Sequence, residues 1–329
     1  MSTVQTLHGP IDSSQLGYTL AHEHVFVSDE GLLQNFPGVC NEEFVIQKAR
    51  EKMTQAYEAG VRTILDAAVL GNGRNVPLVQ RALEGIPMNI LVCTGTFYRD
   101  ELPGFFASQD INVMTRLFVN DIVNGIGDTG VKAAVVKACT DHQGVTFGVE
   151  KALRAAARAH LETGAVLHTH AHALTKQGLA QQKIFKEEGV DLSKVYIGHC
   201  INSDDMDYLH AVLDQGSFIG FDRWAAGPLP PVPGMPPHPP VTREKAVATL
   251  AQLCREGYAN QIVIGNDACS WQWMVRFETE ESSPDLYSNS YLIFPQQVTP
   301  MLLAAGVTQE QIDTMTTETP RRLFEVNAK

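Results

Sequence analysis

The 329-residue sequence contains no apolar run that approaches the roughly 20 consecutive residues of a membrane-spanning helix. Its first residues, MSTVQTLHGPIDSSQ, lack a basic region followed by an apolar one, so we expect no secretory signal. The six cysteines form no CxxC pair and no framework spacing, which is typical of reduced thiols. The sequence therefore predicts a cytoplasmic protein that does not act in a membrane.

Positive charge is also scarce. Lysine and arginine number 25 against 37 aspartates and glutamates, which gives a formal net charge of −12. An acidic surface gains nothing from counterion release, so this balance argues against nucleic acid and anionic membranes as partners. A small-molecule substrate is the partner that remains.

No GxGxxG follows the first apolar run, and no repeat of 20–50 residues is visible. What the chain does contain is a regular alternation of short β-branched runs with amphipathic helical segments. The expected strands are residues 18–25, 62–69, 89–95, 131–140, 165–171, 194–200, 217–223 and 261–268. Helices are expected, among others, over 41–60, 148–164, 204–216 and 243–257.

Eight β–α units in one chain predict an α/β fold of the (β/α)8 TIM-barrel type, as a single domain over 1–329. A doubly wound open sheet is the competing architecture, and the missing GxGxxG speaks against it. Residues 1–16 form an N-terminal extension, and the C-terminal tail is helical. The proline-rich segment 225–241 is predicted to be loop 7, a semi-rigid lid rather than a flexible linker. Residues 269–294 are predicted to be loop 8.

The stretch GYTLAHEHVF places His22 and His24 two residues apart on a strand, so both side chains point to one face. In a barrel, functional groups lie where strands end and βα loops begin. Reading those positions along the chain gives His22, His24, Lys137, His168, His170, His172, His199, Asp222, Arg223 and Asp267. Imidazole with carboxylate is a ligand set suited to zinc and other divalent transition metals. Taken singly, His199 is better explained as a core histidine, and Asp267 could cap the following helix.

Lys137 lies inside the apolar run AAVVKAC. Burial lowers the pKa of a lysine and leaves a neutral amine, which can add CO2 to form a carbamate. Two carbamate oxygens can bridge two metal ions. The alternative is a buried ion pair with an aspartate.

Several segments in order resemble the phosphotriesterase-like family of the amidohydrolase superfamily. They are GPIDSSQLGYTLAHEHVF, GVKAAVVKACTD, TGAVLHTHAH with GLAQQKIF, VYIGHC, IGFDRW and NDAC, and the resemblance covers essentially the whole chain. It is similar in particular to the phosphotriesterase-homology proteins and their allied lactonases. Relatives of this kind are commonly homodimers, so the resemblance implies a homodimer.

The resemblance implies two divalent metal ions per chain, with zinc expected first and cobalt, manganese or iron as alternatives. His22, His24 and Asp267 would hold the more buried ion, and His170 and His199 the more exposed one. Lys137, carboxylated on its side-chain nitrogen, would bridge the two. His170 is preferred over His168 and His172 because it lies six residues after Gly164 and eight before Gly178, as in the family.

The implied reaction is hydrolysis, with a metal-bridging hydroxide attacking the substrate while Asp267 takes the proton. Arg223 and Trp224 match the aspartate–arginine–aromatic motif of the lactonase group. Phe97 stands where those lactonases carry a tyrosine, with Tyr98 next to it, and Trp271 offers an apolar lining. We therefore expect hydrolysis of lactones with apolar substituents, such as N-acyl-homoserine lactones, with weak activity on organophosphate triesters. A different carboxylic ester or an amide is the alternative substrate, and a catalytically silent metal-binding barrel is the alternative of another class.

Overall fold

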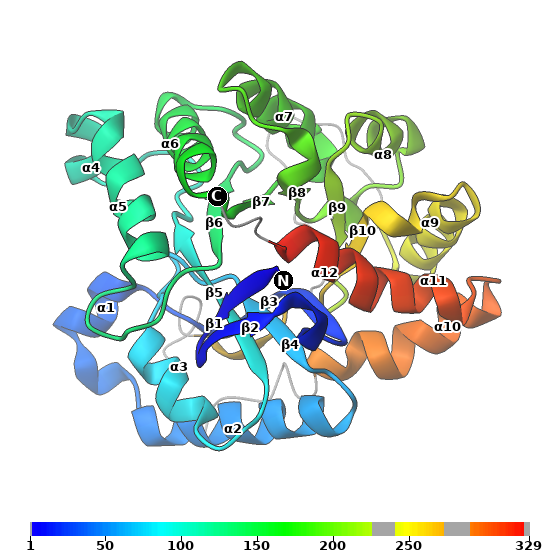
Figure 1. Cartoon of the computed structure of the whole chain (residues 1–329), viewed down its shortest axis with the longest axis horizontal. Coiled ribbons are helices and arrows are strands. Elements are labelled where there is room, and N and C mark those ends of the chain that lie inside the picture. Colours follow the sequence, from blue (N-terminus) through cyan, green and yellow to red (C-terminus); the bar gives the residue numbers. More distant parts are fainter. Residues whose placement is uncertain (1, 226–240, 273–289, 326–329) are drawn as a thin grey trace.

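The computed structural model describes residues 2–225, 241–272 and 290–325, and its centre is a curled sheet of parallel strands (Figure 1). Eight strands occupy the eight predicted runs in chain order. They are β3 (Thr19–Val27), β4 (Thr63–Asp66), β5 (Asn89–Gly95), β6 (Val135–Cys139), β7 (Val166–His170), β8 (Val195–Ile197), β9 (Phe218–Phe221) and β10 (Ile262–Ile264). Each pairs in parallel with the next, and nearly all their residues are buried, as parallel strands covered by helices require.

The sheet closes on itself where the chain after β10 meets β3. The Asp267 amide donates to the carbonyl of His22 at 3.0 Å, and the His24 amide donates to the carbonyl of Ala268 at 2.8 Å. The strand β11 (Cys269–Gln272) then continues parallel to β3. The predicted (β/α)8 barrel is confirmed. The predicted eighth strand is interrupted before Asp267 because this residue adopts a left-handed backbone with φ 52°.

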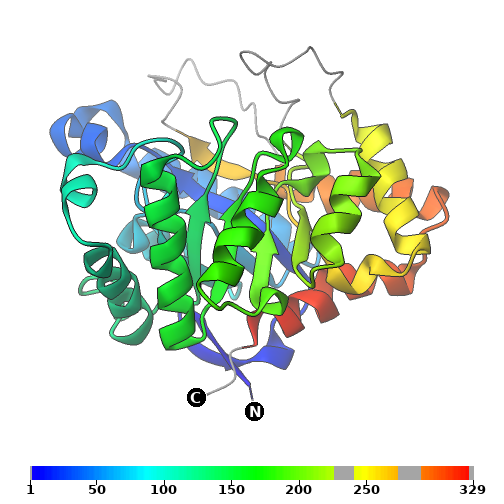
Figure 2. The ribbon, with the colours of Figure 1, turned by 90° about the horizontal axis from the view of Figure 1, so that it is seen from above.

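Helices surround the barrel on its outside (Figures 1 and 2). They are α1 (Glu30–Asn35), α2 (Glu42–Glu58), α3 (Val76–Leu83), α4 (Gly104–Ser108), α5 (Ile111–Val123), α6 (Phe147–Thr163), α7 (Gln177–Glu187), α8 (Met206–Leu213), α9 (Arg243–Arg255), α10 (Thr299–Ala304), α11 (Gln309–Asp313) and α12 (Thr319–Phe324). Asn41 caps α2 by accepting from the Phe44 amide, and Gly164 ends α6 in the left-handed conformation.

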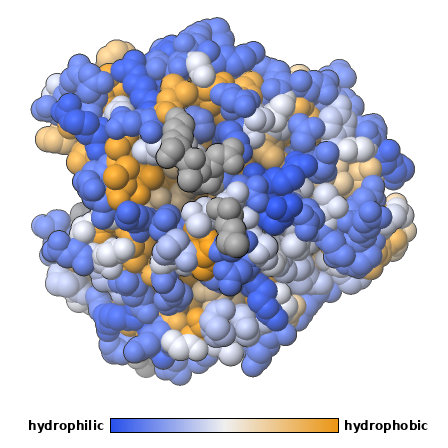
Figure 3. Space-filling view, viewed as in Figure 1, coloured by the Kyte–Doolittle hydropathy of each residue, from blue (hydrophilic) through white to orange (hydrophobic). Residues whose placement is uncertain are grey.

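The amino ends of the strands are covered by the two chain termini. The hairpin of β1 (Thr3–Thr6) and β2 (Gly9–Asp12) lies beside α12 at this end (Figure 2). Side chains from both, Val4 and Phe324 among them, pack against apolar residues inside the barrel. The opposite end, where the strands finish, is left for the site. Hydrophilic residues cover most of the face that carries the termini, with apolar residues in separate groups (Figure 3).

Two sequence predictions lie outside the described residues. The proline-rich loop 7 is described only at its ends, residues 225 and 241, and loop 8 only over 269–272 and 290–294. Within the described part of the chain, no helix is both long enough and apolar enough to cross a membrane.

Candidate metal centre

The structure brings the six predicted metal-ligand side chains together at the carboxyl end of the barrel. The Nζ atom of Lys137 lies 3.5 Å from Nε2 of His22. The His22 and His199 rings are 4.6 Å apart between centroids, and the His199 and His170 rings 4.5 Å. Through these contacts, four strands that are distant in sequence supply one cluster of donor atoms.

Asp267 completes the cluster. Its Oδ1 lies 3.5 Å from Nε2 of His24 and 3.8 Å from Nε2 of His22. Two ligands of one zinc ion, each about 2.1 Å from it, lie about 3.4 Å apart at a tetrahedral angle. The ligand atoms of His22, His199 and Asp267 all lie within 4.8 Å of one another. The donor set therefore has the size and chemistry of a divalent-metal site.

The other oxygen of Asp267 is held by Arg223, whose Nε donates to Oδ2 at 3.0 Å. Burial alone would raise the pKa of Asp267. The hydrogen bond to His24 and the electrostatic influence of His199, His22 and Arg223 outweigh this and hold the pKa well below its ordinary value. Asp267 is consequently a carboxylate, the form that binds a metal.

Asp222 joins two of the ligand histidines, a role that the sequence did not reveal. Its Oδ2 lies 3.1 Å from Nδ1 of His22 and its Oδ1 lies 3.1 Å from Nδ1 of His199, and the side chain is fully buried. Tyr196 also donates to Oδ2 through its hydroxyl group. Burial would raise the pKa of Asp222, but the two histidines lower it well below its ordinary value. An ionised Asp222 accepts from Nδ1–H of both rings, so each Nε2 keeps a lone pair for a metal.

Lys137 is buried on β6, as predicted from its apolar surroundings. Its Nζ donates to the carbonyl of Ala67 at 2.9 Å and lies 5.3 Å above the ring of Phe97. Burial lowers its pKa, which favours the neutral amine. Among the described residues no carboxylate pairs with Nζ, so the alternative of a buried ion pair with an aspartate finds no support.

Backbone conformation also marks the site. Three non-glycine residues of the described chain have positive φ, namely Lys176, His199 (60°) and Asp267 (52°). Two of the three are predicted ligands, and strained backbone of this kind is concentrated at functional sites. A buried glutamate, Glu23, holds the chain on both sides of Asp267 by accepting from the amides of Asn266 at 2.5 Å and Ala268 at 2.8 Å.

The remaining predicted site residues fall into two groups. Phe97 lies against the metal ligands, with its ring 5.2 Å from that of His170. Trp224 is buried beside Phe294, and Trp271 packs edge-on against Phe44 of α2, with ring centroids 5.3 Å apart. Both tryptophans therefore contact the layer between barrel and helices.

Tyr98 accepts a hydrogen bond from the thiol of Cys139 through its backbone carbonyl. His172, which follows β7, lies 3.0 Å through Nδ1 from the hydroxyl of Thr175. These contacts do not join the side chain of Tyr98 or His172 to any of the six predicted metal ligands. The part of Tyr98 in substrate binding stays a prediction.

Burial of neutral histidines predicts acid sensitivity. Burial lowers the pKa of His22 to about 3 and places those of His168 and His170 well below the ordinary value. The unfolded chain binds protons at these side chains below about pH 6.5, whereas the folded chain does not. The free energy of unfolding therefore falls as the pH drops from about 6.5 towards 3, by about 1.4 kcal/mol per pH unit for each histidine. Burial raises the pKa of Glu23, so above the ordinary pKa of a glutamate the folded chain holds a proton there that the unfolded chain has lost. This proton offsets the effect of one histidine on the free energy of unfolding.

Denaturant unfolding of metal-free protein at pH 6.5 and pH 5 measures the effect. We expect the free energy of unfolding to be lower at pH 5 by a few kcal/mol. A His168→Leu variant, which lacks one of the titrating rings, should show a shallower pH dependence. Equal stability of the wild type at both values would contradict the neutral state of the three histidines.

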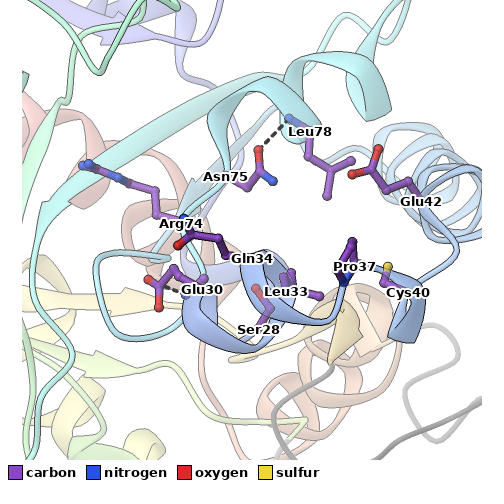
Figure 4. A pocket seen from close by; sticks show the side chains of 11 residues that line it. Ser28, Glu30, Leu33, Gln34, Pro37, Cys40, Glu42, Arg74, Asn75 and Leu78 are labelled. Carbon is purple, nitrogen blue, oxygen red and sulfur yellow. Dashed lines mark hydrogen bonds between the residues drawn. The ribbon is translucent and has the colours of Figure 1, made fainter.

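A cavity of about 360 Å³ lies apart from this centre, between α1, the start of α2 and the loop before α3 (Figure 4). The carboxylate of Glu30 on its wall accepts from the amides of Gly71 and Gly73, at 2.8 and 3.1 Å. Arg74, also on its wall, is paired with Asp121 at 2.7 Å. None of the predicted site residues lines this cavity, and its charged groups are already used within the protein.

Comparisons with known proteins show the family of the chain. The chain matches the Phosphotriesterase family over residues 2–324. It is 40% identical to the phosphotriesterase homology protein of Mycobacterium tuberculosis, with 99% of this chain and 98% of that protein covered. It is 35% identical to the aryldialkylphosphatase of Saccharolobus solfataricus, with 95% and 96% covered. The structure of the phosphotriesterase from Mycobacterium tuberculosis superimposes with a TM-score of 0.88 at 39% identity, covering 98% of both chains.

The barrel and its histidine–aspartate cluster define a metal-dependent hydrolase. The chain belongs to the phosphotriesterase family.

Proposed function

We propose that this hydrolase opens lactones with apolar substituents, with weaker hydrolysis of organophosphate triesters. The observation that carries the proposal is the convergence of His22, His24, Lys137, His170, His199 and Asp267 on one point at the mouth of the barrel. The apolar ring of Phe97 against His170 supports an apolar substrate. The similarity to an aryldialkylphosphatase supports the triester activity.

We assign two divalent cations to this centre, zinc in the first place. His22, His24 and Asp267 would hold one ion, His170 and His199 the other, and carboxylated Lys137 both. The donor set fits, because the histidines with lowered pKa values are neutral and Asp267 is ionised, as metal ligands must be. When bound, a pair of such cations supplies water of lowered pKa and polarises a carbonyl or phosphoryl oxygen.

The residues around the centre divide the remaining work. Asp267, kept ionised and fixed by Arg223, accepts the proton that the attacking water loses. Arg223 retains one buried nitrogen, Nη1, without a hydrogen-bond partner among the described residues. We assign to this nitrogen a hydrogen bond to the ester oxygen of the substrate. Phe97 excludes water from the side of His170 and holds the apolar substituent.

A substrate panel on protein supplied with zinc or cobalt tests the proposal. It compares kcat/KM for γ-lactones of increasing acyl length, aryl esters, N-acyl amines and paraoxon-like triesters. We expect the highest value for lactones, rising with acyl length, because burial of each CH2 group contributes about 0.8 kcal/mol. A preference for aryl esters or amides would contradict the lactone assignment while leaving the hydrolase intact.

Measurement of the metal content distinguishes the proposed hydrolase from a catalytically silent metal-binding barrel. Fewer than about one metal ion per chain after supplementation, together with no hydrolysis of any panel member, would indicate a catalytically silent protein. The control is the same protein after chelation, which should lose its hydrolysis and regain it on addition of zinc.

A further inference from the structure

One buried histidine next to the candidate metal centre, His168, has no assigned role. His168 on β7 is fully buried, and both of its ring nitrogens lack a hydrogen-bond partner among the described residues. A buried polar group without a partner is uncommon, because it loses its hydrogen bonds to water and gains none. Replacing an imidazole at this depth with an apolar side chain would remove that penalty, so packing alone does not explain His168.

The groups around His168 narrow the choice of partner. Its ring packs edge-on against those of His22 and Tyr196, with centroids 4.6 and 4.4 Å away. The hydroxyl of Tyr196 and Nδ1 of His22 are both already bonded to Asp222. The Tyr196 hydroxyl and Nδ1 of His22 are therefore not available to form a hydrogen bond with His168.

Lys137 is a further neighbour of His168. It stands opposite His168 in the register of β6 and β7, so both side chains point to the same face. The Nζ of Lys137 also touches His22, at 3.5 Å from Nε2. His168 and the head of Lys137 thus flank the same imidazole ring. They do not bond to each other directly, since His168 has no partner in the described chain.

We propose that His168 is a positioning residue that donates a hydrogen bond to the carboxylate formed by CO2 on Lys137. This inference rests on the proposed function, which includes that modification. The neutral amine attacks CO2, a nitrogen–carbon bond forms, one C=O bond becomes C–O⁻, and the nitrogen releases one proton to water. The nitrogen keeps one N–H, which continues to donate to the carbonyl of Ala67. The new carboxylate adds the acceptor that His168 lacks.

The experiment measures carboxylation rather than activity. Protein with zinc is equilibrated with increasing 13C-labelled bicarbonate, and the 13C NMR signal of the carbamate gives the half-saturating CO2 concentration. His168→Leu should raise this half-saturating concentration by about tenfold or more, because it removes a hydrogen bond to a charged group. The same substitution should leave the thermal stability of the metal-free protein equal or higher, because it removes an unpaired polar group.

Matched variants identify the donor. His168→Asn places an N–H near Nδ1 and His168→Gln places one near Nε2, so one of the two should restore carboxylation to near the wild-type level. His160→Leu, which removes a buried histidine from α6, is the control and should leave half-saturation unchanged.

An unchanged half-saturating concentration in His168→Leu would overturn this inference while leaving the proposed function in place. Wild-type protein without any carbamate signal would overturn both. A carbamate that weakens equally in the Leu, Asn and Gln variants, with lower thermal stability in all three, would show a packing role and likewise overturn the inference.

Discussion

A Lys137→Met protein is expected to lose hydrolysis of every substrate by at least about 10³-fold and to retain fewer metal ions than the wild type. Methionine fills a similar volume on β6 but has no nitrogen to carboxylate, so the shared ligand of the two proposed cations disappears. Since burial already disfavours the charged lysine, removal of the amine should not destabilise the barrel strongly. Metal content by mass spectrometry, kcat/KM and denaturant unfolding are the three measurements.

Lys52 provides the matched control. It is also a buried lysine, and its Nζ donates to the carbonyl of Ser270 at 3.3 Å, outside the ligand cluster. Lys52→Met should retain metal content and hydrolysis to within a few-fold of the wild type, even if its stability falls. Full turnover by Lys137→Met, or equal losses in both variants, would show that the buried amine at position 137 has no special part in hydrolysis.

Much of this site could be predicted because strand geometry fixes which side chains meet. Alternation on β3 aims His22 and His24 to one face, and a parallel barrel brings strand ends together whatever their distance in sequence. Lys137 was identified for a second reason, since a charged residue in an apolar run must be either neutral or paired. The structure supports the neutral state.

Some features of the site could not be predicted, because they depend on which side chains of different strands come into contact. Asp222 is 200 residues from His22 along the chain, and only folding shows that its carboxylate joins His22 to His199. The sequence also leaves Asp267 open as a helix cap, and the structure decides against that role because the strand β11, not a helix, follows it. Strand parity puts His168 and His170 on one face of β7, but it says nothing about the missing hydrogen bonds of His168.

The second large effect is expected for Asp222→Asn. The two oxygens of Asp222 face Nδ1 of His22 and Nδ1 of His199, so an ionised carboxylate fixes both rings with a proton on Nδ1. An asparagine offers one oxygen and one NH2 group, and the NH2 group cannot accept a hydrogen bond. One of the two rings must then carry its proton on Nε2, the nitrogen that faces the metal centre.

A protonated Nε2 cannot bind a metal, so Asp222→Asn should weaken the affinity for one of the two proposed cations by about 10- to 100-fold. A comparable tautomer error in a catalytic triad lowers kcat by about 10⁴, and we expect a fall of between 10²- and 10⁴-fold here, as an order-of-magnitude range. Zinc titration by calorimetry should resolve one weakened step beside one that is nearly unchanged. Asp121→Asn, which removes a carboxylate paired with Arg74 outside the centre, is the control for loss of a partly buried charge.

Two results would separate tautomer control from simple destabilisation. If Asp222→Asn bound both cations as tightly as the wild type but unfolded more easily, the carboxylate would serve only the packing of β9 against its neighbours. If both zinc steps weakened equally, the substitution would have disturbed both rings together, and the argument from one misplaced proton would fail. We expect unequal effects on the two zinc-binding steps because the carboxylate of Asp222 offers an acceptor oxygen to each of His22 and His199. The asparagine amide offers an acceptor oxygen to one ring and a donor NH2 group to the other.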